Sequence, residues 1–341
     1  MTKSIESQYR VLSDVEHIRL RPQMYAGSTE PESKEIFVYQ NKQMRKVEVK
    51  VIPAFVKIVD EILDNSVDAH KRNPEKLNCL KVIFDDSTIT VEDNGGISVE
   101  LHTEYNMYAP ELIFGQLRSG SNYNDAEDQM LAGTHGLGAK ISNILSKQFI
   151  VETCDGKKSF VQKFTNGMTE RTEPVIKKST KNYTKITFTP DYEFFKMPGL
   201  TEDHKNKIVR RLIDISGTDP GLKVICNGEE ININDFKEYV NLYAEDVIYE
   251  DYGDWKIGVS ASSGFQQTSF VNSVETYMGG THVEYVANQI VTALRDYVKK
   301  KFKIEVKPSD IKSQFHLFIS CNINRPKFSS QTKENMVSAV S

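Results

Sequence analysis

Residues 61–68 have the sequence Glu61-Ile62-Leu63-Asp64-Asn65-Ser66-Val67-Asp68, the most informative segment of this 341-residue chain. It lies within residues 53–73, where apolar side chains recur at the 3.6-residue spacing of a helix. A proline opens this region and an Asn-Pro pair closes it, as is typical of helix ends. The sequence therefore predicts a helix over residues 53–73, with three polar side chains at positions i, i+4 and i+7 on one face: Glu61, Asn65 and Asp68.

The polar face of this predicted helix gathers three carboxylates and a carboxamide, because Asp64 stands next to the other three. A cluster of like charges favours a nearby cation. Oxygen ligands with few protein bonds suit Mg²⁺ that is held jointly with phosphate groups. Taken alone, the cluster is more typical of an acidic helix face in contact with solvent.

A hairpin is predicted directly after this helix. Residues 80–84 and 88–92 are β-branched runs around a polar turn, and the second run leads into Asp93-Asn94-Gly95-Gly96. Asp93 could accept a hydrogen bond from an exocyclic amine such as that of adenine, and the glycines would let a flat base approach. The alternative is an ordinary turn aspartate. Thr184, which begins a strand over residues 184–188, is by itself only a typical strand residue.

A long glycine-rich loop is predicted before the next helix. Its last part is Gly133-Thr134-His135-Gly136-Leu137-Gly138-Ala139-Lys140, and a helical pattern resumes at Ile141. Free backbone N–H groups at a helix N-terminus suit a polyphosphate, and Lys140 could add a positive charge. A glycine-rich loop alone is a weak signal, and an ordinary flexible loop would have the same composition.

The remaining pattern predicts two domains. Residues 149–153, 159–164 and 184–189 are expected to form one antiparallel sheet, followed by a helix over residues 202–215. A second strand-rich region follows residues 227–234, with strands at 255–260, 267–272 and 315–322 and a long helix through residues 286–298. Residues 30–50 resemble a strand-rich insertion and receive no role.

The composition is that of an ordinary globular chain, with 39% hydrophobic and 26% charged residues. The formal net charge of -4 provides no global basic field for nucleic acid, so any DNA contact must be local. The four cysteines are widely separated, which argues against a zinc site or a disulfide framework. Because the N-terminus lacks an apolar segment and no long apolar run occurs, we expect an intracellular, soluble protein that does not associate with membranes.

The succession of acidic helix, Asp-Gly turn, glycine loop and Thr strand resembles the GHKL ATPase family, which includes gyrase, MutL and histidine kinases. Further segments narrow the resemblance to the ATPase and transducer regions of type II DNA topoisomerases, closest to eukaryotic topoisomerase II and the large subunit of T-even phage topoisomerases. These segments are Glu16 to Ser28, Ile113 to Leu117 with Ser121 to Tyr123, Gly264 to Gln267 with Phe270 to Asn272, and Ser330-Gln331-Thr332-Lys333-Glu334-Asn335-Met336.

The resemblance implies an α+β chain. Residues 1–232 would form a GHKL (Bergerat) α/β sandwich with an N-terminal dimerisation arm. Residues 233–341 would form a ribosomal S5-like transducer that is cut short at its C-terminal end. The local pattern departs from the family at two points, because the turn after Asp93 is one residue shorter and Gly120 replaces a serine of the eukaryotic enzymes.

The resemblance also implies residue roles in ATP hydrolysis with Mg²⁺. Glu61 would be the general base, Asn65 the Mg²⁺ ligand, and Asp93 the adenine-binding residue. Gln331 and Lys333 would reach the γ-phosphate from the second domain. The other nucleotide contacts would come from Asp68, Ser121, Asn122, residues 133–140, Thr184 and, from the partner subunit's arm, Tyr9.

As implied by the same resemblance, two copies would close on ATP around a double-stranded DNA, and hydrolysis would reopen this gate. DNA cleavage would belong to TOPRIM and cleavage domains outside these residues. The compartment would be a bacterial or phage-infected cytoplasm or a eukaryotic nucleus. Two alternatives remain at this stage: a MutL-like repair ATPase, and an ATP-gated clamp with negligible turnover. The lysines at 299–301 and Lys303 could face DNA, or could simply stabilise a helix C-terminus.

Overall fold

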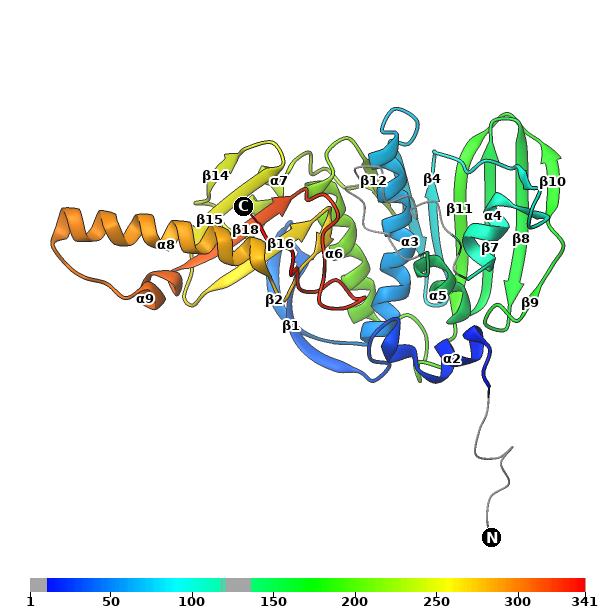
Figure 1. Cartoon of the computed structure of the whole chain (residues 1–341), viewed down its shortest axis with the longest axis horizontal. Helices are drawn as coiled ribbons and strands as arrows, with labels where there is room; N and C mark the ends of the chain where they lie inside the picture. The colour runs from blue at the N-terminus through cyan, green and yellow to red at the C-terminus, as the bar shows by residue number, and fades with distance from the viewer. Residues whose placement is uncertain (1–10, 118, 120–135, 341) are drawn as a thin grey trace, which may run out of the picture.

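The computed structural model describes residues 11–117, 119 and 136–340 (Figure 1). Their first part forms a nine-stranded sheet in the order β10-β8-β7-β11-β4-β3-β12-β13, with β9 paired to β8. Neighbouring strands are antiparallel except β12 and β3, which are parallel. The strands are β3 (Cys79–Phe84), β4 (Ile89–Asp93), β7 (Ser146–Asp155), β8 (Lys158–Thr165), β9 (Glu170–Arg171), β10 (Val175–Lys178), β11 (Asn182–Pro190), β12 (Lys223–Cys226) and β13 (Glu229–Glu230).

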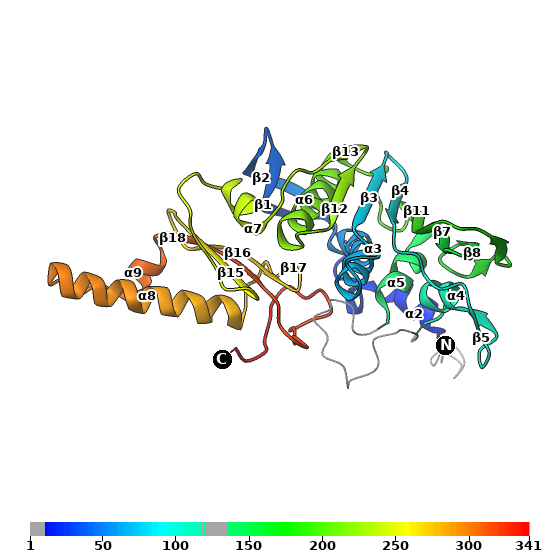
Figure 2. The same cartoon turned by 90° about the horizontal axis from the view of Figure 1, so that it is seen from above.

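Helices cover one face of this sheet (Figure 2). They are α3 (Pro53–Arg72), α4 (Ala109–Gly115), α5 (Gly138–Ile144) and α6 (Glu202–Thr218), with α2 (Asp14–Leu20), a 3₁₀ turn (Pro22–Met24) and the short strands β5 (Leu101–His102) and β6 (Met107–Tyr108) at the periphery. The helix predicted over residues 53–73 is thus confirmed, as are the β3–β4 hairpin and the antiparallel sheet of β7, β8 and β11.

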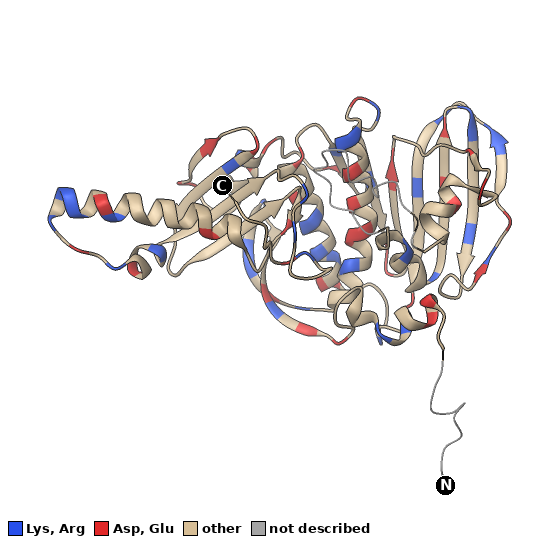
Figure 3. Cartoon of the chain, in the orientation of Figure 1, with Lys and Arg blue, Asp and Glu red and all other residues tan. Residues whose placement is uncertain are grey.

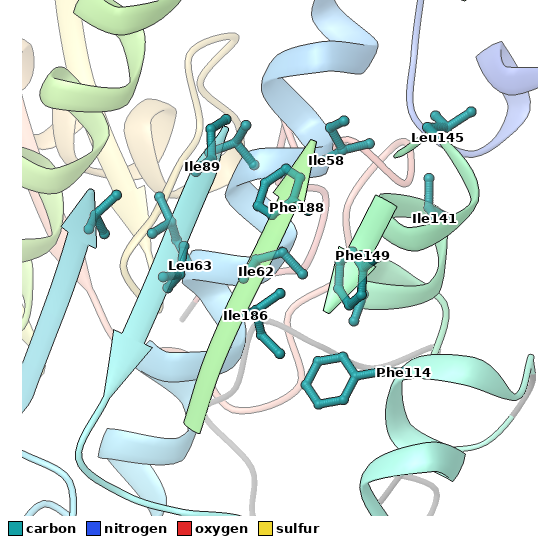
Figure 4. Close-up of a cluster of buried hydrophobic side chains, with 14 of the residues drawn as sticks. Ile58, Ile62, Leu63, Ile89, Phe114, Ile141, Leu145, Phe149, Ile186 and Phe188 are labelled. Atoms are coloured by element: carbon teal, nitrogen blue, oxygen red, sulfur yellow. The ribbon is translucent and has the colours of Figure 1, made fainter. Parts of the chain in front are cut away.

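The apolar stripe of α3 fixes its position on the sheet. Ile58 and Ile62 lie in the same buried cluster as Ile186 and Phe188 of β11, while Ile141 of α5 closes the cluster at its end (Figure 4). Each of these side chains is nearly inaccessible to solvent. Full burial of one such side chain contributes roughly 1.5–3 kcal/mol, so the stripe fixes α3 against the face of the sheet.

The second part of the chain is a five-stranded sheet in the order β14-β15-β18-β16-β17 with one long helix. Its strands are β14 (Ile248–Asp251), β15 (Trp255–Ala261), β16 (Gln266–Val271), β17 (Val274–Glu275) and β18 (Phe315–Cys321). Its helices are α7 (Phe236–Asn241), α8 (Thr281–Phe302) and α9 (Pro308–Lys312). The distal end of α8 projects away from the body of the molecule (Figure 1).

The predicted insertion at residues 30–50 is a two-stranded hairpin, β1 (Glu32–Gln40) and β2 (Gln43–Val51). It contacts the second part of the chain: the Met44 N–H donates a 2.8 Å hydrogen bond to the Leu242 carbonyl, and the Phe37 ring lies 4.9 Å from the Tyr243 ring. The hairpin therefore bridges the two sheets. The domain division at residue 232 stays a prediction.

Of the helices in the described ranges, none combines the length and the apolar character needed to cross a membrane.

Candidate nucleotide-binding site

A cavity of about 290 Å³ lies between α3 and the end of the sheet where β4 finishes and β11 begins. Both apolar and polar side chains line it. Its lining consists of Ile62, Asn65, Ser66, Ala69, Arg72, Asn73, Lys76, Leu77, Val91, Asp93, Gly95, Gly96, Ile97, Phe114, Thr184 and Ile186. A mostly apolar hollow with a few fixed polar groups is the usual form of a small-molecule site.

Asp93 is the fixed acceptor at one end of this cavity. Its carboxylate accepts hydrogen bonds from Ser66 Oγ at 2.8 Å and from the Gly95 N–H at 2.9 Å. Burial raises the pKa of the Asp93 carboxyl, and these hydrogen bonds oppose that rise. Thr184 pairs directly with Asp93 across the β4–β11 ladder, and its hydroxyl lies 3.1 Å from that of Thr153. The Asp93 carboxylate is therefore held by Ser66 of α3 and by the turn that follows β4, and Thr184 of β11 lies beside it.

The two glycines after Asp93 allow the backbone to pack closely at this end. Gly96 has φ of +74°, and a Cβ on it would overlap the Cys154 carbonyl of β7. A Cβ on Gly95 would lie 2.7 Å from the Leu77 side chain. A side chain at Gly96 would displace β7, so this position requires glycine, whereas a side chain at Gly95 would push the Leu77 side chain that lines the cavity.

Glu61 lies one helical turn before Asn65 on α3 and is almost fully buried. Its carboxylate forms an ion pair with the Lys57 ammonium, four residues earlier on the same helix. Burial lowers the pKa of Lys57, but the charges of Glu61 and Asp64 outweigh burial, so the pKa lies above its usual value. The Glu61 carboxylate also packs against the first residue of α5, where a Cβ on Gly138 would overlap it. Lys57 and Gly138 together fix the direction of this carboxylate.

The acidic face of α3 is not open to solvent, which corrects one of the two interpretations of the sequence. Asp64 is buried and pairs with Arg211 of α6 at 2.7 Å. Asp68 is buried as well, outside the cavity lining, and its charge interacts with Lys71. Each of these carboxylates thus interacts with a cation of the protein itself: Asp64 with Arg211 of α6, and Asp68 with Lys71 of α3.

Asn65 differs from its buried neighbours, since it is exposed and lines the cavity. Within the described ranges, no group of three or more His, Cys, Asp and Glu side chains could hold a metal ion. A cation in this cavity would therefore depend on Asn65 and on oxygens of the ligand. This arrangement fits Mg²⁺ that arrives with phosphates.

Lys140 does not line the cavity. Its ammonium is buried and donates to the Gly136 carbonyl at 2.7 Å and to the Ser119 carbonyl. Burial lowers the pKa of Lys140 to about 8. Gly138 and Ala139 begin α5, as expected for a helix after the glycine loop, and Leu137 packs against the core. The remaining predicted contacts lie outside the described residues: Tyr9, Ser121, Asn122, Gly133, Thr134 and His135.

The Gln-Thr-Lys segment, which follows the five-stranded sheet in the chain, reaches residues of the first part of the chain. Lys333 is only 5% exposed, has φ of +59°, and its charge helps to lower the pKa of Asp64. The Thr332 methyl group lies 3.6 Å from the position of a Cβ on Gly27. Gln331 is half-buried. Lys333 thus brings a positive charge to the Glu61 end of α3, opposite the Asp93 end.

Comparisons with known proteins agree with this geometry. A family model described as "Histidine kinase-, DNA gyrase B-, and HSP90-like ATPase" matches residues 51–193, and one described as "DNA gyrase B" matches residues 228–341. The crystal structure of the ATPase region of Saccharomyces cerevisiae topoisomerase II matches with a TM-score of 0.94 and 38% identity, over 99% of this chain and 92% of that one. The chain belongs to the type II DNA topoisomerase family.

Relatives of this topoisomerase ATPase region are much longer than the chain itself. A probable DNA topoisomerase 2 of Dictyostelium discoideum is 41% identical over 99% of this chain, and DNA topoisomerase 2 of Pisum sativum is 41% identical over 98%. The chain spans 23% and 24% of their lengths, respectively. The predicted GHKL fold with a transducer is confirmed by the match to the topoisomerase II ATPase region, to which the chain corresponds.

Several residues of the topoisomerase site were missed in the sequence. Ser66, which bonds Asp93, follows Asn65 directly in the motif and could have been recognised from that position. Lys57 stands four residues before Glu61, the spacing of a helical ion pair, which was also a visible signal. No sequence signal pointed to Arg211, because 147 residues separate it from Asp64. The apolar lining of the cavity, which includes Phe114 and Ile186, likewise depends on tertiary packing.

Gly138→Ala is expected to destabilise the topoisomerase ATPase region by about 1–3 kcal/mol, because the new methyl group overlaps the buried Glu61 carboxylate. Urea unfolding measures this change. The same substitution in a Glu61→Ala background provides the control, since the clash partner is then absent and the cost should fall below about 1 kcal/mol. Equal costs in both backgrounds would show that Gly138 does not constrain Glu61.

Proposed function

We propose that the cavity binds ATP and that the chain hydrolyses it to ADP and phosphate with Mg²⁺. The observation that supports this most directly is the row of groups along α3. A buried carboxylate (Glu61), an exposed carboxamide (Asn65) and a hydroxyl bonded to a fixed acceptor (Ser66 with Asp93) follow one another over about one and a half helical turns. At one end of this row Asp93 would accept a hydrogen bond from a nucleotide base. At the other end Glu61 would accept a proton from water.

Glu61 is the proposed general base. A base must be held within hydrogen-bonding reach of the attacking water, and the contacts with Lys57 and Gly138 restrict its carboxylate to one direction. Asn65 would contribute a ligand to Mg²⁺, which neutralises charge on the phosphate oxygens when it is bound. Asp93, supported by Thr184, would accept the hydrogen bond of the adenine amine. Asp68 does not line the cavity, and we assign it a supporting role.

Lys333, with Gln331 beside it, would contact the γ-phosphate from the second domain. Lys333 is buried, and its charge acts on Asp64, three residues after Glu61 on α3, which supports this proposal. Such a contact exists with ATP and is absent with ADP. A ligand shifts a conformational equilibrium only through different affinities for the two states, so this lysine would make the domain arrangement sensitive to the nucleotide.

In the whole enzyme we propose that two such chains dimerise on ATP and enclose a DNA duplex, with TOPRIM and cleavage domains acting on another. The protein would then work inside the cell, where it meets DNA. The lysine cluster at the end of α8 is exposed (Figure 3). We assign it no DNA role here, because Lys299 pairs with Glu305 and Lys301 lies over the Tyr297 and Phe302 rings.

The test combines sedimentation with single-turnover hydrolysis on the chain as it is. A non-hydrolysable ATP analogue with Mg²⁺ should convert the monomer to a dimer, and ATP should be cleaved to ADP. Dimerisation with the analogue but no cleavage of ATP would favour the clamp that never turns over. If the analogue does not bind at all, the assignment of the cavity to ATP is wrong.

A further inference from the structure

Arg211 joins the catalytic helix to the second domain. It lies on α6 with 5% of its surface exposed. One guanidinium nitrogen donates to Asp64 of α3 at 2.7 Å, and the other terminal nitrogen donates to the Ser273 carbonyl at 2.6 Å. Asp64 belongs to the nucleotide-binding helix, three residues after Glu61, whereas Ser273 belongs to the turn between β16 and β17. One side chain of the first domain thus connects the site to the second sheet.

Several hydrogen bonds hold the turn that accepts this bond. Asn272 and Ser273 both have positive φ, of 53° and 67°. The Asn272 side chain exchanges two 2.9 Å hydrogen bonds with the backbone of Ile323, just after the central strand β18. Lys71 of α3 donates to the Ser273 hydroxyl at 2.9 Å. A displacement of this turn therefore displaces the start of the segment that leads to Lys333.

Two further ion pairs join α6 to the second sheet beside this turn. Glu275 of β17 receives Lys207 at 2.9 Å and Arg210 at 3.2 Å, both from α6. Burial tends to raise the pKa of Asp64, but the charges of Arg211, Lys333 and Lys57 outweigh it and lower the pKa. Asp64 consequently interacts with the arginine that holds the turn and with the lysine proposed to meet the γ-phosphate.

We propose that the Asp64–Arg211–Ser273 connection couples occupancy of the nucleotide site to the position of the second domain. This inference rests on the proposed function, because it requires Lys333 to respond to the γ-phosphate. When Lys333 turns to the phosphate, Asp64 loses one of the three cations that act on it, and its interaction with Arg211 changes. Arg211 passes this change to the β16–β17 turn through a bond to a backbone carbonyl. Arg211 is a positioning residue and does not touch the nucleotide.

Arginine is required for this role because its planar fork can serve two acceptors at once. Lysine keeps the positive charge toward Asp64 but has a single nitrogen, so it cannot also hold the Ser273 carbonyl in the same geometry. Arg211→Lys therefore keeps the positive charge beside Asp64 and removes the bond to the Ser273 carbonyl. Asp64→Asn, which retains the shape and an acceptor but removes the charge, tests the other side of the connection without a large change in volume.

The experiment measures the distance between spin labels on the two domains. Labels are placed at the exposed positions of Glu75→Cys and Tyr252→Cys. The half-buried Cys79 and Cys226 are replaced by serine, and the buried Cys154 and Cys321 are left in place. The distance is recorded without nucleotide and with a saturating non-hydrolysable ATP analogue and Mg²⁺. Calorimetry gives the affinity of each variant for the analogue.

With arginine at position 211, the analogue should shift the label distance. Arg211→Lys and Asp64→Asn should each reduce this shift by roughly half or more, while affinity for the analogue changes by less than about threefold. The matched control is Arg19→Lys: Arg19 bridges Asp191 at 2.7 Å and the Ile144 carbonyl at 2.8 Å, but within the first domain only. This control should retain the full shift.

Two outcomes would overturn the coupling: a full shift in both Arg211→Lys and Asp64→Asn, or no shift in the protein with arginine 211 and bound analogue. A purely structural role for Arg211 would lower thermal stability and leave the nucleotide-dependent shift intact. Failure of the analogue to bind would instead overturn the proposed function.

Discussion

Glu61→Gln is expected to slow single-turnover ATP hydrolysis by roughly 10²-fold to 10⁴-fold, because glutamine keeps the size of the side chain but cannot take a proton from water. The affinity for a non-hydrolysable analogue should stay within about threefold, since Glu61 does not line the base-binding part of the cavity. Analogue-driven dimerisation should persist. Rapid-quench hydrolysis, calorimetry and sedimentation measure the three quantities separately.

The control for this experiment is Glu152→Gln. Glu152 also pairs with a lysine, Lys185 at 2.9 Å, but on the sheet and away from the cavity. Loss of that ion pair should leave hydrolysis within about twofold of its original rate, because a pair near the surface contributes little. Hydrolysis by Glu61→Gln at the original rate would show that another group accepts the proton.

Asp93→Asn is expected to weaken binding of the ATP analogue by about 10-fold to 100-fold. A hydrogen bond to a charged group contributes about 1.5–3 kcal/mol, and each 1.4 kcal/mol corresponds to tenfold in affinity. The amide also places a donor where the base presents its own amine. The rate of hydrolysis at saturating ATP should change much less, because Asp93 lies at the end of the cavity away from Glu61.

Asp85→Asn provides the matched control, since Asp85 lies in the turn of the same β3–β4 hairpin. It accepts hydrogen bonds from the N–H groups of Ser87 and Thr88, both at 2.8 Å, far from the cavity. Thermal unfolding with and without the analogue distinguishes the variants. Asp93→Asn should lose most of the stabilisation by the analogue, and Asp85→Asn should keep it. Equal stabilisation in both variants would contradict the role of Asp93.

The elements with strong local signals were predicted close to their observed bounds. The helix α3 was expected over residues 53–73 and spans Pro53–Arg72, because its apolar spacing and its prolines act locally. Thr184 has no signal of its own, and only the resemblance placed it in the site. The structure pairs it with Asp93 across the β4–β11 ladder. The hairpin at residues 30–50 was recognised as strand-rich, but its bridging position depends on Phe37 and Met44 meeting the second domain.

The sequence alone left open whether solvent or another helix covers the acidic face of α3. A row of acidic residues on a helix has the same pattern whether solvent or another helix covers it. Here α6 covers it, and Arg211 reaches Asp64 across 147 residues of sequence. Since the desolvation of a carboxylate is tolerated only with a partner, burial and pairing had to occur together. Neither is encoded in the spacing of residues 61–68.

The sequence by itself determined the helix, the glycine turn, the order of the motifs and hence the family, because these depend on local backbone preferences and on residue identity. Tertiary structure alone decided which of the polar groups on α3 are buried and paired and which one remains exposed. Lys57 and Gly138 fix Glu61, Arg211 engages Asp64, and Asn65 remains exposed in the cavity. The physical reason is that burial and ion pairing depend on what packs against each face of α3, and those contacts come from helices and loops distant in sequence.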